Sequence, residues 1–133
     1  MISDLPAGAS PDFRDPKVLR HDGYYYMVLG NSLGKGAWHG GDGCIQLYRS
    51  SNLVEWTYVG IPIRSAGALG TMWECPDLFR LEDKWVLTFS PMFNGSRKAM
   101  YLVGEMDFTL PRFTVEQIGD LDRGGDWYAA QSM

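Results

Sequence analysis

The amino-acid sequence predicts an all-β fold, and three observations support this prediction. Runs of aromatic and β-branched residues are broken by Gly, Asp, Asn and Pro, and few stretches of ten or more residues show a helical period. Hydrophobic residues make up 45% of the chain and aromatic residues 14%, so the chain can bury a core. A pattern of strands and turns also occurs twice. At 133 residues, a single domain is expected.

The first unit of this pattern is expected to contain four strands. Residues 16–20 and 24–30 form a hairpin around "HDG", because Asp and Gly adopt the positive φ of a tight turn at low cost. The next two strands are expected over 44–50 and 56–60, within "CIQLYRSSNLVEWTYVG".

The second unit is expected to repeat this order. Its strands are predicted over 77–81, 84–90, 99–105 and 112–118. The segment "DPKVLRHDGYYYMVLG", which begins at Asp15, aligns with "CPDLFRLEDKWVLTFS", which begins sixty residues later at Cys75. The matching pairs are Pro16 with Pro76, Val18 with Leu78, Leu19 with Phe79, Arg20 with Arg80 and Tyr25 with Trp85.

Four-stranded units in tandem are typical of β-propeller blades. The sequence therefore predicts one partial propeller domain with blade-like units over about 12–70 and 71–122, and the start of a further blade over 123–133. Stacked repeats usually need at least three neighbours, and a propeller needs closure. Exposed blade faces and edges are therefore expected to permit a homo-oligomer.

An acidic residue lies beside a proline near the first strand of each unit. Asp15 belongs to "RDP" and Glu74 to "ECP". Because proline disfavours a helix at the preceding residue, each acid is expected to be extended at the start of a strand. The innermost strands of a propeller line one channel, so the two carboxyls are expected to face a common cavity. A protonated carboxyl paired with an ionised one is the arrangement that cleaves glycosidic bonds.

The neighbours of the two acids indicate different roles. Trp73 and Cys75 would surround Glu74 with low-dielectric surface, which favours the neutral acid that a proton donor requires. Arg14 beside Asp15 would favour the carboxylate, which suits an anion that binds hydroxyls or stabilises positive charge. A surface turn with a local ion pair would explain "RDP" alone, but the spacing shared with "ECP" favours a function.

Several classes of partner are not expected. The formal charge of −4 includes no basic run, so neither nucleic acid nor an anionic membrane surface is predicted to bind. No segment has the length of a signal peptide's apolar region or of a membrane span, which predicts a cytoplasmic location. His21 and His39 lack metal-site spacing and the two cysteines lack zinc-site pairing, so no metal or other cofactor is expected.

Four stretches resemble successive signatures of glycoside hydrolase family 32, which includes invertases, levanases, inulinases and sucrose-6-phosphate hydrolases. They are "FRDPKV", "SSNLVEW", "WECPDLF" and "DWYAAQS". The resemblance implies a five-bladed β-propeller that hydrolyses β-fructofuranosidic bonds with retention, in sucrose, sucrose 6-phosphate or fructans. By position, Glu74 corresponds to the general acid/base and Asp15 to the transition-state stabiliser.

The resemblance also places other residues near the pocket. Arg14 lies beside the stabiliser, and Asp126, Tyr128 and Gln131 of "DWYAAQS" are expected close to the site. The candidate substrate-binding residues are Arg14, Trp73, Cys75, Asp77 and Trp38, of which the two tryptophans would stack on sugar faces. Cys75 is expected to be a buried neighbour of Glu74 and not a nucleophile, because no base lies near it in the sequence.

One departure from the family pattern affects activity. The family's nucleophile is an Asp in a "WMNDPNG"-like motif, and Asp4 in "MISDLPAG" and Asp12 in "SPDFRD" do not match it. The chain is therefore expected to be an internal fragment, covering the second and third blades and the start of the fourth, that is inactive by itself. The alternatives are a non-catalytic carbohydrate-binding or self-associating truncated propeller, a related glycosidase acting on arabinosides, and a fructosyltransferase. The "ECPD" signature disfavours the last two.

Overall fold

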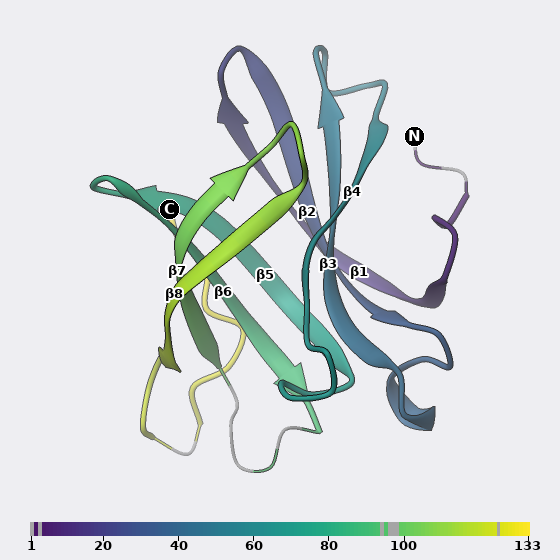
Figure 1. Cartoon of the computed structure of the whole chain (residues 1–133), viewed down its shortest axis with the longest axis vertical. Helices are drawn as coiled ribbons and strands as arrows, with labels where there is room; N and C mark the ends of the chain where they lie inside the picture. The colour runs from purple at the N-terminus through teal and green to yellow at the C-terminus, as the bar shows by residue number, and fades with distance from the viewer. Residues whose placement is uncertain (1, 3, 94, 96–98, 125) are drawn as a thin grey trace.

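The protein consists of two four-stranded antiparallel sheets that pack face to face (Figure 1). The computed structural model describes residues 2, 4–93, 95, 99–124 and 126–133. In both sheets the strands follow chain order, so each sheet is a simple meander. Within the described ranges, no helix has the length and apolar character needed to cross a membrane. The all-β prediction is confirmed.

All eight predicted strands form, with shifted ends. The first sheet contains β1 (Ala9–His21), β2 (Tyr24–Leu33), β3 (Asp42–Ser50) and β4 (Thr57–Arg64). The second contains β5 (Met72–Leu81), β6 (Lys84–Met92), β7 (Met100–Asp107) and β8 (Arg112–Asp120). A short 3-10 turn, η1 (Ala37–His39), separates β2 from β3. Strands β1 and β5 begin before the positions predicted from the sequence, because each continues N-terminally through an irregularity at its proline.

The turn between β1 and β2 explains the hairpin register. Asp22 has a φ of 44° and Gly23 a φ of 81°, so two consecutive residues adopt the positive φ that a tight two-residue hairpin turn requires. The prediction of a turn at "HDG" is confirmed.

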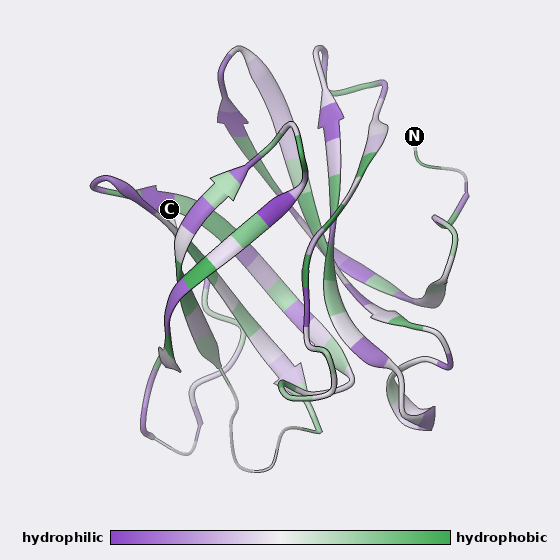
Figure 2. Cartoon of the chain, viewed as in Figure 1, coloured by the Kyte–Doolittle hydropathy of each residue, from purple (hydrophilic) through white to green (hydrophobic). Residues whose placement is uncertain are grey.

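The core lies between the two sheets, where alternate side chains of each strand point towards the other sheet. Trp73 stacks on Phe89 with ring centroids 4.0 Å apart, and its Nε1 donates a hydrogen bond of 2.7 Å to the carbonyl oxygen of Leu69. The hydropathy colouring shows the hydrophobic positions along the strands that supply this core (Figure 2). The buried members of the shared core are Tyr26, Val28, Ile45, Leu47, Trp73, Leu78, Trp85, Leu87, Phe89, Met100, Leu102, Phe108 and Phe113.

Glycines allow the backbones of the two sheets to approach closely. A Cβ at Gly30 of β2 would lie 2.0 Å from the carbonyl oxygen of Trp73, and one at Gly43 of β3 would lie 2.5 Å from the Trp73 ring. Side chains at these two positions would therefore push β5 away from the first sheet. The close approach brings the first strands of the two sheets, β1 and β5, into contact.

Candidate functional site

Paired irregularities in β1 and β5 form the framework of the site. The pairing of β1 with β2 shifts between Arg14 and Lys17, and the pairing of β5 with β6 shifts between Glu74 and Asp77. Each shift contains a proline, which has no N–H to continue the ladder and is tolerated at bulges and on edge strands. Both strands are at the edge of their sheet. The "DP" and "CP" dipeptides thus specify two bulges sixty residues apart.

The residue before each proline adopts a left-handed backbone conformation. Asp15 has a φ of 59° and Cys75 a φ of 49°. The expectation of an extended acid is therefore wrong for Asp15, because the bulge imposes the turn. The structure also shows that Asp15 is equivalent to Cys75, whereas Glu74, paired with Ser90, is equivalent to Arg14, paired with Gly30. The two acids thus occupy neighbouring, not identical, positions of the two sheets.

Asp15 nevertheless reaches the second sheet at the Cys75 bulge. Its Oδ2 accepts a hydrogen bond of 2.9 Å from the backbone N–H of Cys75 and lies 3.5 Å from Cys75 Sγ. Burial, together with the charge of Asp15, raises the pKa of the Cys75 thiol to about 11. The thiol is therefore neutral at pH 7 and donates to Asp15, as expected for a neighbour that is not a nucleophile.

Each carboxylate oxygen of Glu74 accepts one hydrogen bond from a side chain. Oε1 accepts from Arg14 Nε at 3.2 Å, and Oε2 accepts from the Tyr128 hydroxyl at 2.8 Å. The Glu74 side chain is 18% exposed, so it is accessible from one side. Burial and the hydrogen bond to Glu74 raise the pKa of Tyr128, which keeps the phenol protonated and able to donate.

Arg14 is not the partner of Asp15, as its position in the sequence predicted, but of Glu74. Its guanidinium contacts Glu74 and, at 3.4 Å, Asp12 Oδ1, whereas Asp15 interacts with Cys75. The reason is geometric: adjacent residues of a strand point to opposite faces, and residues two apart share a face. Asp12, whose Oδ2 also accepts from the Ala37 N–H at 2.8 Å, was missed for the same reason. The spacing of Asp12 and Arg14, two residues apart and therefore on one face of the strand, is the sequence signal that indicates this contact.

The C-terminal segment, residues 126–133, brings Tyr128 to the site. No strand forms among the described residues that follow β8. Instead, Gln131 Nε2 donates to the Cys75 carbonyl oxygen at 3.1 Å, and the Ala129 N–H donates to Ser90 Oγ at 3.2 Å. Tyr128 and Gln131 therefore contact the residues predicted to carry the chemistry.

Asp77 is buried where β1 and β5 meet the C-terminal segment. Its side chain is fully buried, accepts a hydrogen bond from the Ser132 N–H and forms an ion pair of 3.4 Å with Lys17. Lys17 Nζ also donates to the Ser132 carbonyl oxygen at 2.8 Å. The expectation that Asp77 binds substrate is replaced by a structural role, because its carboxylate fixes the C-terminal segment to β1 and β5. Its Oδ1 has no hydrogen-bond partner within the described part of the chain.

The two candidate tryptophans differ in exposure. Trp73 is 0% exposed in the shared core, so its ring offers no free face to a sugar. Its assignment to the pocket is corrected for this reason. Trp38 on η1 is 70% exposed and contacts the ring of Phe93, with centroids 4.9 Å apart.

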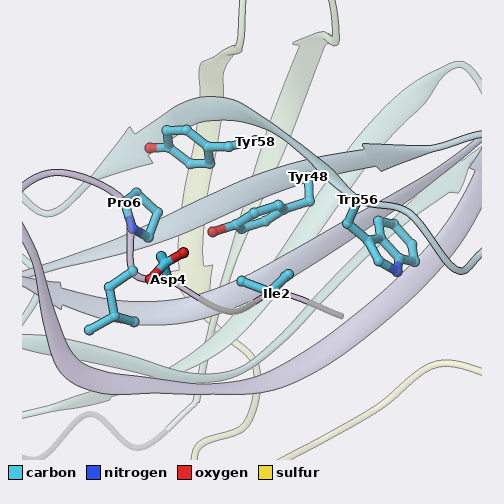
Figure 3. Close-up of a pocket in the computed structure, with 7 residues that line it drawn as sticks. Ile2, Asp4, Pro6, Tyr48, Trp56 and Tyr58 are labelled. Carbon is cyan, nitrogen blue, oxygen red and sulfur yellow. The ribbon is translucent and has the colours of Figure 1, made fainter.

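One pocket of the molecule is formed by the N-terminal segment and the first sheet. Figure 3 shows Ile2, Asp4 and Pro6 of the N-terminal segment opposite Tyr48 of β3, Tyr58 of β4 and Trp56, which precedes β4, around a pocket of about 220 Å³. Neither Asp15 nor Glu74 lines it. Among the residues that the structure describes, no group of three His, Cys, Asp or Glu side chains is arranged to hold a metal ion.

Comparison with known sequences identifies close relatives of the whole chain. The profile described as "Glycosyl hydrolases family 32 N-terminal domain" matches residues 1–133. The sucrose-6-phosphate hydrolase of Bacillus subtilis is 36% identical over 146 aligned residues. The alignment covers all of this chain and 29% of the relative, so the chain spans less than a third of that protein's length.

Solved structures agree with the sequence match. A Bombyx mori GH32 beta-fructofuranosidase mutant in complex with sucrose superposes with a TM-score of 0.81 at 35% identity. The sucrose-6-phosphate hydrolase of Lactobacillus gasseri superposes with a TM-score of 0.78 at 30% identity. Each superposition covers 96% of this chain and 28% of the other.

Proposed function

The chain belongs to glycoside hydrolase family 32, and we propose that it carries the acid/base and the transition-state stabiliser of a retaining hydrolase of β-fructofuranosidic bonds. Its two sheets are two blades of the five-bladed propeller of that family; within the chain we call the sheet of β1–β4 the first blade and the sheet of β5–β8 the second. The proposed substrates are sucrose, sucrose 6-phosphate or fructans, in line with the names of the relatives. One observation carries the proposal: Asp15 of the first blade bonds to the bulge of the second blade immediately beside Glu74.

In the proposed mechanism Glu74 transfers the protons. As an acid it protonates the leaving glycosidic oxygen, and as a base it then takes a proton from the water that releases fructose. Arg14 and Tyr128 each bind one oxygen of Glu74 and hold the carboxyl in a fixed orientation. The ion pair with Arg14 leaves the Glu74 side chain partly exposed, so a leaving-group oxygen or a water can approach it.

Asp15 has the second role in this proposal. Its carboxylate accepts hydrogen bonds from fructosyl hydroxyls and stabilises the positive charge that develops on the sugar ring. The backbone N–H and the neutral thiol of Cys75 fix one of its oxygens without adding charge. The side chain is thus oriented before substrate binds.

The nucleophile is not assigned to any of the 133 residues, because none lies in a "WMNDPNG"-like motif. A retaining glycosidase needs a second carboxyl about 5 Å from the acid to attack the anomeric carbon. The isolated chain is therefore expected to bind fructosides without hydrolysing them. Sustained release of fructose from sucrose or inulin by the purified chain would contradict this expectation.

Substitution of the two acids tests the proposal directly. Glu74→Gln and Asp15→Asn are expected to weaken fructose binding about tenfold each in calorimetry, because each removes an anionic acceptor at the sugar. Both variants should unfold at urea concentrations close to that of the parent chain. Glu105→Gln, an exposed acid on β7, is the matched control. Loss of stability in both variants with unchanged fructose affinity would assign the two acids a structural role.

A self-associating, non-catalytic domain is the second candidate. One observation favours it: a separate apolar cluster lies on the face of the first sheet that points away from the second. Met27, Leu29 and Tyr48 are already buried there under Ile2, Phe13 and Trp56, which are only partly buried, so a second chain would contact these three covering residues. Light scattering at high protein concentration is expected to detect dimers if two chains pair through this face, and a monomer at all concentrations would exclude this candidate.

A further inference from the structure

Two large aromatic rings at the edge of the site are exposed and touch each other. Trp38 of η1 is 70% exposed and Phe93, immediately after β6, is 56% exposed. Their rings meet edge to face at 4.9 Å with an interplanar angle of 73°. This pair, which we term the aromatic platform, connects a loop of the first blade with a loop of the second.

The backbone around the platform is held in unusual conformations. Phe93 has a φ of 57°, a left-handed conformation that is costly for a bulky residue. The η1 turn is enclosed by Gly36 and Gly40, with φ values of 84° and 74°. Thr71 Oγ1 donates to the Ala37 carbonyl oxygen at 2.8 Å, so the turn is also fixed to the segment that precedes β5. The Trp38 turn is thus attached by a hydrogen bond to the segment before β5, and both rings are exposed.

The platform adjoins the carboxyl groups through one side chain. Arg14, which binds Glu74, also approaches Met92 Sδ at 4.0 Å, and Met92 precedes Phe93. Asp12, the other partner of Arg14, accepts from the N–H of Ala37, which precedes Trp38. Arg14 thus contacts Glu74 directly, and it is connected to Phe93 through Met92 and to Trp38 through Asp12 and Ala37.

We infer that Trp38 and Phe93 bind the sugar unit that neighbours the fructosyl unit at Asp15 and Glu74. Sugar rings present an apolar C–H face to aromatic rings and hydroxyls to charged groups, and the platform and Arg14 supply these two kinds of surface. Two rings are too small for a stable protein interface, which needs about 800 Å² from each partner. The consequence is a preference for fructosides of two or more units over free fructose. This inference rests on the proposed function.

Binding measurements on the chain and its variants test the inference. The ligands are fructose, sucrose and a short inulin-type trisaccharide. Calorimetry and the NMR signal of the Trp38 indole N–H measure their binding. The trisaccharide is expected to bind about tenfold more tightly than fructose. In Trp38→Ala and in Phe93→Ala this ratio should fall towards one while fructose affinity is retained. Leu110→Ala, which removes a side chain 67% exposed beyond β7, is the matched control.

The outcomes separate the inference from the proposed function. An unchanged ratio in both aromatic variants, with fructose binding that depends on Glu74, overturns the platform alone. A trisaccharide-induced shift of the Trp38 signal, with fructose binding that does not depend on Glu74 or Asp15, supports the platform and contradicts the proposed function. Absence of binding by all three sugars overturns both. A Trp38→Ala substitution that converts a dimer to a monomer overturns the inference in favour of self-association.

Discussion

The pKa of the Tyr128 hydroxyl depends on the charge of Glu74. The phenol donates to Glu74 Oε2, and the tyrosinate form would place a second negative charge beside a carboxylate. Burial contributes most to the raised pKa of Tyr128, and the hydrogen bond and the charge of Glu74 add to it. The ionisation of Tyr128 therefore depends on a residue 54 positions away in the sequence.

Glu74→Gln is expected to lower the pKa of Tyr128 towards 10, although burial should keep it above that value. The change removes the anion that opposes tyrosinate, so the alkaline transition moves to lower pH. NMR titration of ¹³C-labelled tyrosine rings measures it. Tyr58, whose pKa burial raises to about 12 and whose hydroxyl donates to Gln46, is the internal control and should not respond. An unchanged Tyr128 titration would show that the contact with Glu74 is absent in solution.

The sequence predicted which acids to examine but not their partners. Asp15 and Glu74 could be chosen because each lies beside a proline at a repeated position. Arg14 was assigned to its sequence neighbour Asp15, although alternation along a strand turns adjacent side chains to opposite faces. Trp73 was assigned to the pocket although the same alternation directs it into the core. Spatial partners such as Tyr128 depend on the path of a whole segment, which no local pattern specifies.

The bulges in β1 and β5 show how much an element's sequence determines. Every strand was predicted, because period-two patterns and glycine or aspartate turns are local signals. The left-handed residues Asp15 and Cys75 were not, because a residue before proline normally prefers extended backbone. The pairing of β1 with β2 and of β5 with β6 shows that the ladder is interrupted at Pro16 and Pro76. The C-terminal segment likewise lacks a periodic signal, and its position depends on contacts with β1 and β5.

Lys17→Met is expected to lower the free energy of unfolding by about 3 kcal/mol, because it leaves the buried Asp77 carboxylate without its cation. The amide of Ser132 should also exchange faster with solvent, since Lys17 holds its carbonyl oxygen. Urea unfolding and hydrogen exchange provide the two measurements.

Lys84→Met is the matched control for this prediction. Lys84 forms ion pairs of 2.8 Å with Glu105 and with Glu116, but these pairs are exposed to solvent. Exposed pairs contribute little to stability, so the urea midpoint should stay close to that of the parent chain. Equal destabilisation by the two substitutions would contradict the assignment of Asp77 and Lys17 as the attachment of the C-terminal segment.

The two sheets are expected to unfold as one unit because they share one core. Side chains of β2 and β3 interleave with those of β5, β6 and β7, and β2 contacts β5 through backbone as well as side chains. Propeller blades depend on their neighbours in this way, since a four-stranded sheet alone leaves its apolar face exposed. The site follows from the same packing, because Asp15 and Glu74 come together only when β1 and β5 are held at this distance.

Gly30→Ala tests this dependence. The new methyl group would meet the Trp73 carbonyl oxygen at 2.0 Å, where backbone and not a flexible side chain must move, so a loss of about 3 kcal/mol is expected. Hydrogen exchange of β6 amides should accelerate as much as that of β2 amides, although the substitution lies in the first sheet. Gly34→Ala, which has open space but a φ of 72°, should cost only about 1 kcal/mol. Retained protection of β6 in Gly30→Ala would show that the second blade folds without the first, and the shared core would then not be what holds the two acids together.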